Sequence, residues 1–152
     1  MVKMVPIEHR NPAVRTFMLF TQQAGATIKY LDSRFYRANK LSMIKYITLR
    51  ILLINGGTMK HSELARWTNT KKHNITALVD RMKAEQLVTT ERSQKDKRVN
   101  NVVLTDKGRE SFKQANIEAR KIVQHLMHGF DENDTHEFER LLHIIKENIE
   151  RD

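Results

Sequence analysis

The spacing of apolar residues changes from a helical to a strand pattern near residue 87, and this change constrains the fold more than any other feature. Before it come HSELARW (61–67), the polar turn TNT (68–70) and KKHNITALVDRMKAEQ (71–86). After it come LVTTER (87–92) and VNNVVLT (99–105), both rich in residues that favour strands, with SQKDK between them. A short helix, a tight turn and a second helix predict a helix-turn-helix, and the hairpin that follows predicts a winged one.

Helical periodicity continues on both sides of this region. Apolar residues recur at three- and four-residue steps over 11–36, and Ser42 is placed to cap a helix that ends at Asn55-Gly56-Gly57. Thr105 and Asp106 are placed to cap a helix reaching about Phe130, and a last helix begins near Asp134. We expect a mainly α fold of six helices with a small β-hairpin wing, in a single domain over 1–152.

Composition narrows the function classes. The chain has 152 residues and no cysteine, which excludes disulfides, thiolate zinc sites and thiol-based redox sensing. The polar start is not a secretory signal, and the longest aliphatic run, ILLI at 51–54, is far too short to cross a bilayer. We therefore expect a soluble cytoplasmic protein. No glycine-rich phosphate loop, His-Glu zinc helix or nucleophile signature is present, so we expect no enzymatic activity.

The net charge of +9 is unevenly distributed along the chain. Residues 1–59 carry 9 basic and 2 acidic side chains, residues 60–98 carry 10 and 5, and residues 99–152 carry 8 and 11. A basic surface on part of a small protein favours a polyanionic partner, nucleic acid first, although basic side chains also serve solubility.

The second helix of the predicted helix-turn-helix has an apolar side and a polar side. Residues at the start of a recognition helix contact base edges, and its N-terminus favours phosphate. Asn74 has the donor and acceptor for adenine, Lys72 or His73 for guanine, and Thr76 has a methyl group for thymine. The predicted DNA-contacting residues of this helix are Lys71, Lys72, His73, Asn74 and Thr76.

The tip of the predicted hairpin is basic and contains one acid. Lys95, Lys97 and Arg98 can reach a minor groove or a phosphate row, and Asp96 can pair with Arg98 and fix its direction. A soluble turn with Asp as the turn former is the alternative.

DKRVNNVVLTDKG (96–108) resembles the wing signature of the MarR family of transcriptional regulators, with Asp96, Arg98, Leu104, Thr105 and Gly108 at its characteristic positions. SELA (62–65) and LVDRM (78–82) are similar to two upstream segments of that family. The resemblance covers about residues 12–150. It implies a homodimer built by helices 11–36 and 105–152, a winged helix-turn-helix over 41–104, and binding of double-stranded DNA at a pseudo-palindromic operator.

Three positions depart from the family pattern. Gln86 stands where the family usually has Gly, so it must adopt a left-handed conformation at a cost of about 1 kcal/mol, or the helix must end differently. Thr90 replaces a common Arg, and Ala77 occupies a position that is often polar or basic.

The resemblance also implies a repressor that responds to a small organic effector and needs no cofactor. Candidate effector contacts are Phe17, Tyr30, Met43 and Tyr46, although aromatic and Met side chains at helical spacing are more often core. Some relatives sense zinc, and His125 and His128 lie one turn apart; structural sites usually need four ligands, so we expect no metal. The alternatives are a metal-sensing regulator and an architectural protein that binds DNA without sequence preference.

Overall fold

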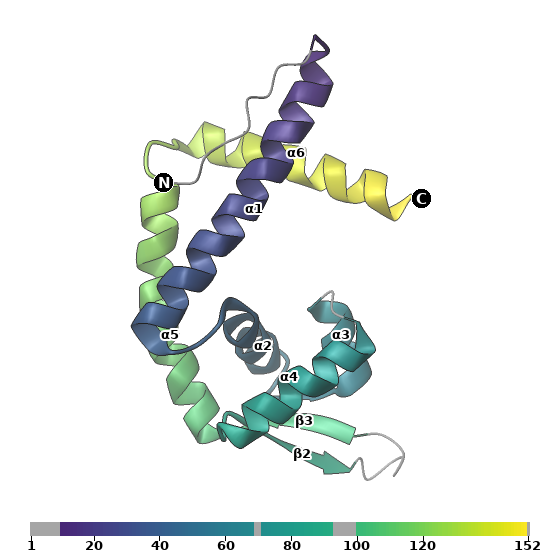
Figure 1. Ribbon diagram of the computed structural model, residues 1–152, viewed down its shortest axis with the longest axis vertical. Helices are drawn as coiled ribbons and strands as arrows, with labels where there is room; N and C mark the ends of the chain where they lie inside the picture. Colours follow the sequence, from purple (N-terminus) through teal and green to yellow (C-terminus); the bar gives the residue numbers. More distant parts are fainter. Residues whose placement is uncertain (1–9, 69–70, 93–99, 152) are drawn as a thin grey trace. The chain divides into compact units, whose positions relative to one another are not determined.

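The computed structural model describes residues 10–68, 71–92 and 100–151 (Figure 1). The chain divides into two compact units, Met1–Ala119 and Arg120–Asp152. Six helices and three strands follow one another in these residues: α1 Pro12–Asn39, α2 Met43–Ile54, β1 Thr58–Lys60, α3 His61–Trp67, α4 Lys72–Ala84, β2 Val88–Arg92, β3 Asn100–Leu104, α5 Asp106–Leu126 and α6 Glu132–Glu150. The predicted helix-turn-helix and the two predicted wing strands are confirmed.

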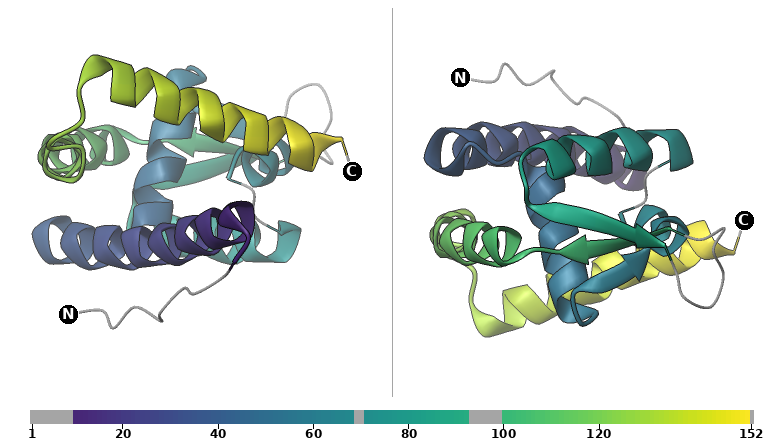
Figure 2. Two further views of the ribbon diagram at one scale, coloured as in Figure 1. Left: turned by 90° about the horizontal axis from the view of Figure 1, so that it is seen from above. Right: turned by 90° about the horizontal axis from the view of Figure 1, so that it is seen from below.

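The three strands form one antiparallel sheet in the order β1-β3-β2. β2 and β3 lie side by side (Figure 2), with Val88 opposite Leu104 and Thr90 opposite Val102. β1 pairs with the other edge of β3, with Met59 opposite Val102. Met59, Val88, Val102 and Leu104 are buried, so one face of the sheet closes over the helices of the winged region. β1 was not predicted, because a three-residue strand carries no measurable alternation.

The first unit is built around side chains that are almost completely inaccessible to solvent. They come from α1, α2, α3, α4 and β3: Phe35, Leu49, Leu52, Leu64, Ile75, Val79, Met82 and Val102. Burying apolar surface of this size supplies the main favourable free energy of folding. The core therefore lies beneath α4 and holds that helix by one face.

The start of α2 is stabilised differently from the prediction. Ser42 occupies the N-cap position but makes no capping bond through its side chain. The carboxylate of Asp32, from α1, accepts the hydrogen bond from the Met43 N–H at 2.9 Å instead. Asp32 thus satisfies one of the exposed amides of α2 and joins the end of α1 to the winged region.

The predicted cap of α5 is confirmed in detail. The Thr105 hydroxyl accepts a hydrogen bond from the Gly108 N–H at 3.0 Å, which is the bond that a capping threonine makes. The same hydroxyl lies 2.7 Å from the Gln86 carbonyl oxygen and 2.9 Å from that of Leu87, to which it donates. A Cβ at position 108 would collide with the Leu87 carbonyl. Thr105 and Gly108 therefore fasten α5 to the junction between α4 and β2.

The second unit holds the end of α5 and the whole of α6. Asp131 and Asp134 form a reciprocal capping box at the start of α6. None of the described α6 residues is buried. No helix in the described ranges is long and apolar enough to span a membrane.

Candidate nucleic-acid interface

The turn between α3 and α4 is set by a threonine. The Thr68 backbone N–H and its hydroxyl both donate to the Leu64 carbonyl, at 3.0 and 2.8 Å, and so end α3 after two turns. Lys71, three residues after Thr68, has an extended backbone and directly precedes α4. The distance in sequence between the two helices is that of a helix-turn-helix.

The N-terminus of α4 is suited to an anion. Its N-cap residue, Lys71, offers no side-chain oxygen to the first amides, and its first turn contains no acidic residue. The amides of the first turn of a helix and the positive end of its dipole attract phosphate. The sequence thus places two lysines, rather than a capping acid, where a phosphate would lie.

The two faces of α4 separate core from surface. Ile75, Leu78, Val79 and Met82 are buried. Among the predicted DNA-contacting residues, Lys71, His73, Asn74 and Thr76 are exposed, all in the N-terminal half of the element. The structure gives the position of Lys72 in the helix but not its side chain. The wing candidates Lys95, Asp96, Lys97 and Arg98 lie outside the described residues.

The C-terminal end of α4 is a tight left-handed turn. Gln86 has φ 63°, and its neighbours close the two bonds of a Schellman motif: Gln86 N–H to the Lys83 carbonyl at 2.8 Å and Leu87 N–H to the Met82 carbonyl at 2.9 Å. Of the two alternatives expected at Gln86, a left-handed conformation or a different helix end, the structure shows the left-handed conformation. The side chain of Gln86 also accepts a bond of 3.4 Å from Lys107 of α5.

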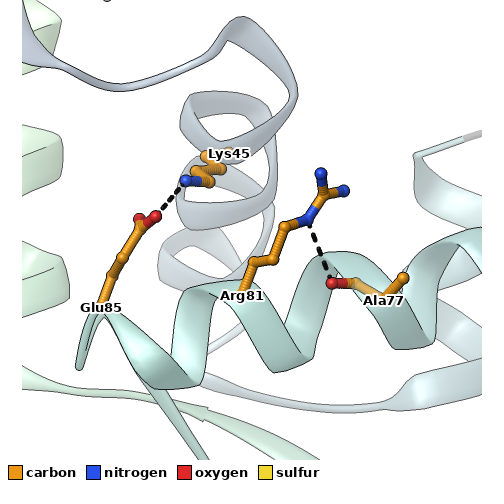
Figure 3. A network of polar contacts seen from close by, with 4 residues as sticks. All are labelled: Lys45, Ala77, Arg81 and Glu85. Atoms are coloured by element: carbon orange, nitrogen blue, oxygen red, sulfur yellow. Dashed lines mark hydrogen bonds and ion pairs between the residues drawn. The ribbon is translucent and has the colours of Figure 1, made fainter.

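An ion pair joins α4 to α2. Lys45 Nζ lies 2.5 Å from Glu85 Oε1 (Figure 3), and the lysine side chain is only 14% exposed against 47% for the glutamate. Glu85 stands at the C-terminal end of α4, where the helix dipole disfavours an acid. Lys45 offsets this repulsion, so the pair fixes the C-terminal end of α4 against α2.

Arg81 is a functional candidate that the sequence alone did not reveal. Its Nε donates to the carbonyl oxygen of Ala77 at 3.2 Å, so the side chain runs back along α4 (Figure 3). Both residues are exposed. The sequence gives one indication of this arrangement: the basic residue Arg81 follows the small residue Ala77 by one helical turn.

His61, the first residue of α3, has a pKa below its ordinary value. Partial burial lowers this pKa most; the nearby carboxylate of Asp80 raises it, and the ammonium of Lys83 lowers it. Burial of the imidazole thus disfavours its charged form, and the opposing charges of Asp80 and Lys83 on α4 modify this effect.

The candidate effector contacts are spread over different environments. Tyr46 is buried, stacks on Phe112 at 5.3 Å between ring centroids, and donates its hydroxyl to Asn116 Oδ1 at 2.9 Å. The ring centroid of Phe35 lies 4.9 Å from that of Tyr46. Tyr30 and Met43 are half-buried, whereas Phe17 is exposed and lies 13 residues before Tyr30 on α1, which is about 20 Å along a helix. Phe17 and Tyr30 thus cannot touch one ligand within a single chain.

His125 and His128, the weak metal candidates, lie at the end of α5 and just beyond it. The His128 N–H donates to the His125 carbonyl at 3.4 Å, as in a closing helical turn. Within the ranges that the structure describes, no three His, Cys, Asp or Glu side chains gather in a way that would hold a metal ion.

Comparison with known proteins agrees with this geometry. The MarR family model matches residues 40–99, which span α2, the helix-turn-helix and the start of the wing. In this region the chain resembles the MarR family. The chain is 28% identical over 122 residues to the HTH-type transcriptional repressor IacR of Pseudomonas putida, covering 76% of this chain and 73% of IacR.

Solved structures of transcriptional regulators share the fold. Sco3205, a MarR family transcriptional regulator from Streptomyces coelicolor solved in complex with DNA, superimposes with a TM-score of 0.83 at 18% identity over 88% of each chain. The organohalide-sensing regulator RdhR-CbdbA1625 in its 2,4-dichlorophenol-bound form superimposes with a TM-score of 0.79 at 20% identity, covering 96% of this chain and 89% of that chain.

Proposed function

We propose that the chain is a sequence-specific transcriptional repressor that binds double-stranded DNA as a homodimer. The observation that carries the proposal is α4: a helix held by a buried apolar face, with exposed Lys71, His73, Asn74 and Thr76 at an N-terminus without acids. These side chains offer donors and acceptors for base edges in a major groove. IacR, the 28% identical relative, is a repressor of the helix-turn-helix type.

Two copies of α4 are needed to read a long site. Exposed apolar side chains on α6, and separately on α1, each offer a second copy a face on which to bind. Those of α6 include Phe138, Leu141, Leu142, Ile144 and Ile149. A two-fold dimer reads two half-sites of opposite orientation, with centres about 34–36 Å apart. The operator is therefore an inverted repeat, and the bound dimer acts by excluding polymerase from a promoter in the cytoplasm.

An organic effector would regulate this binding. RdhR-CbdbA1625 has been solved with 2,4-dichlorophenol, and the aromatic group around Tyr46 joins α1, α2 and α5 here. An effector shifts the dimer between DNA-competent and incompetent spacings only by its difference in affinity for the two. The proposed regulator needs no cofactor, and its effector would be an aromatic or apolar small molecule.

Selection of bound duplexes from a random pool tests the proposal. We expect enrichment of one inverted repeat, protected over two adjacent major grooves on the same side of the DNA. An architectural protein that coats DNA without sequence preference would enrich no motif. That result would overturn the proposal even if the affinity were high.

A further inference from the structure

We propose that Arg81 is a DNA-contacting residue of α4, and that it places a guanidinium where Ala77 leaves the recognition surface without a functional group. The proposal rests on the function proposed above and extends it. The partner is the same DNA, and the chemistry is that of a guanidinium with a phosphate oxygen or with the O6 and N7 atoms of guanine.

The positions of three residues on α4 make the contact geometrically reasonable. Asn74, Ala77 and Arg81 are spaced by three and four residues, so they follow one another along one side of the helix. All three are exposed. Ala77 ends at its Cβ and offers neither a donor nor an acceptor. Along this side of α4, Asn74 would therefore be the last residue able to hydrogen-bond to DNA if Arg81 pointed away from it.

Arg81 does not point straight out. The bond of 3.2 Å from its Nε to the Ala77 carbonyl turns the side chain toward the N-terminal half of α4 (Figure 3). A guanidinium has five N–H donors, and this bond uses the one on Nε. The other four are on the two terminal nitrogens, which form the fork that matches a phosphate or a guanine edge. Fixing the side chain before binding lowers the entropy lost when DNA binds.

The acidic neighbours of Arg81 pair with lysines. Glu85, one turn further along the helix, is bound to Lys45 at 2.5 Å. Asp80 lies 3.9 Å from the ammonium of Lys83. These pairs reduce the attraction of both carboxylates for the guanidinium, whose positive charge is then directed outward toward a polyanion. The Lys45–Glu85 pair thus contributes to the site as well as to the position of the helix.

The test compares Arg81→Ala with Lys83→Ala on the selected operator and on a shuffled duplex. Lys83 is exposed and loses the same charge, but it lies two residues on and thus on nearly the opposite side of α4. We expect Arg81→Ala to weaken operator binding about tenfold or more, and Lys83→Ala to weaken it about threefold or less. A phosphate contact also lowers the salt slope by about one, whereas a guanine contact relaxes sequence preference at one position.

A double variant separates a direct contact from a general effect of charge or folding. Ala77→Arg in the Arg81→Ala background returns a guanidinium to the same stripe, and we expect it to restore at least half of the lost affinity. Equal effects of the two alanine variants, or no rescue in a variant with unchanged helicity and mass, would overturn the inference. If the unaltered protein does not distinguish operator from shuffled duplex, the proposed function itself fails, which is a different result.

Discussion

Gln86 shows how much a single residue can depart from its family and keep the local fold. Its φ of 63° lies in the region that a glycine adopts without strain and that a residue with a Cβ adopts at a cost of about 1 kcal/mol. The two Schellman bonds and the Thr105 hydroxyl hold the turn around it. The surrounding bonds, rather than the intrinsic preference of Gln86, determine the conformation.

Gln86→Gly should therefore raise the free energy of unfolding, by about 0.5–1 kcal/mol, because the strain disappears and only one exposed side-chain bond to Lys107 is lost. Urea unfolding monitored by circular dichroism measures this change. Gln86→Ala is the control, because it keeps the Cβ and removes the bond; it should be no more stable than the starting protein. A less stable glycine variant would show that the turn is not strained.

At the residue scale, the sequence predicted backbone conformations better than it predicted which side chains form hydrogen bonds or ion pairs with each other. The left-handed Gln86 and the Thr105 cap follow from local rules about glycine positions and helix ends. The Asp32 cap of α2 and the Lys45–Glu85 pair were missed, because their members stand 11 and 40 residues apart. Nothing in a single sequence shows which distant side chains the fold brings together.

At the scale of elements, α4 is held both by its apolar face and by its C-terminal end. The apolar face is buried in the core, and the end is joined to α2 by Lys45 and to α5 through Thr105. Of the two charges in the ion pair, the lysine is the more buried. Removing Glu85 and removing Lys45 should therefore lower the free energy of unfolding by different amounts.

Glu85→Gln should lower the free energy of unfolding by about 1–2 kcal/mol, because a largely buried ammonium loses its counter-charge. Lys45→Met should lower it by less than about 1 kcal/mol, because the remaining glutamate is half exposed and the methionine fills the same space. Urea unfolding of both variants and of the double variant measures the coupling. Equal losses in the two single variants would mean that burial of Lys45 does not determine the energetics.

The long periodic helices and the two wing strands were predictable, and the short β1 was not. Periodicity needs several residues to be visible, and β1 has three. Its pairing with β3 depends on the Gly56-Gly57 turn, where both residues have positive φ and the Gly57 carbonyl accepts from the Leu104 N–H at 2.7 Å. The strand β1 is therefore stabilised by its pairing with β3 rather than by the strand preference of its own residues.

At the scale of the whole molecule, the exposed apolar side chains of α6 and α1 are the feature that a single chain leaves unexplained. Phe138, Leu141 and Leu142 are each more than a third exposed, and Val14, Phe17 and Met18 of α1 are similar. On each helix, a row of exposed large apolar side chains indicates an interface. A homodimer is the occupant that the proposed function requires.

We expect the chain to sediment at twice its mass of 17.9 kDa at micromolar concentration. Leu141→Asp places a charge on the apolar stripe and should shift the protein to the monomer, because burying an unpaired carboxylate costs several kcal/mol. His143→Asp is the control on the same helix: it lies two residues on, at an exposed position on nearly the opposite side, and should leave the dimer intact. A monomeric starting protein, or an equal effect of both variants, would exclude α6 from the interface.

The function could be inferred from the sequence, but the site only in part. The order of elements and the wing signature indicated a resemblance to the MarR family, whose model matches residues 40–99. The exposed N-terminal residues of α4 were proposed as DNA contacts from their position after the turn. The sequence did not suggest the contact proposed for Arg81, because that proposal depends on a rotamer, namely the turn of its side chain back toward Ala77. Rotamers depend on neighbours in space, and a helical pattern does not specify them.

The most direct test of the central claim is the ratio of affinities for the selected operator and for a shuffled duplex of the same length, measured near 100 mM salt. If α4 reads bases, the operator should be bound at least about a thousandfold more tightly, since specific binding typically exceeds non-specific binding by 10³ or more. A ratio near one, with the same steep dependence on salt for both duplexes, would contradict sequence-specific recognition and leave only attraction between a basic protein and phosphate.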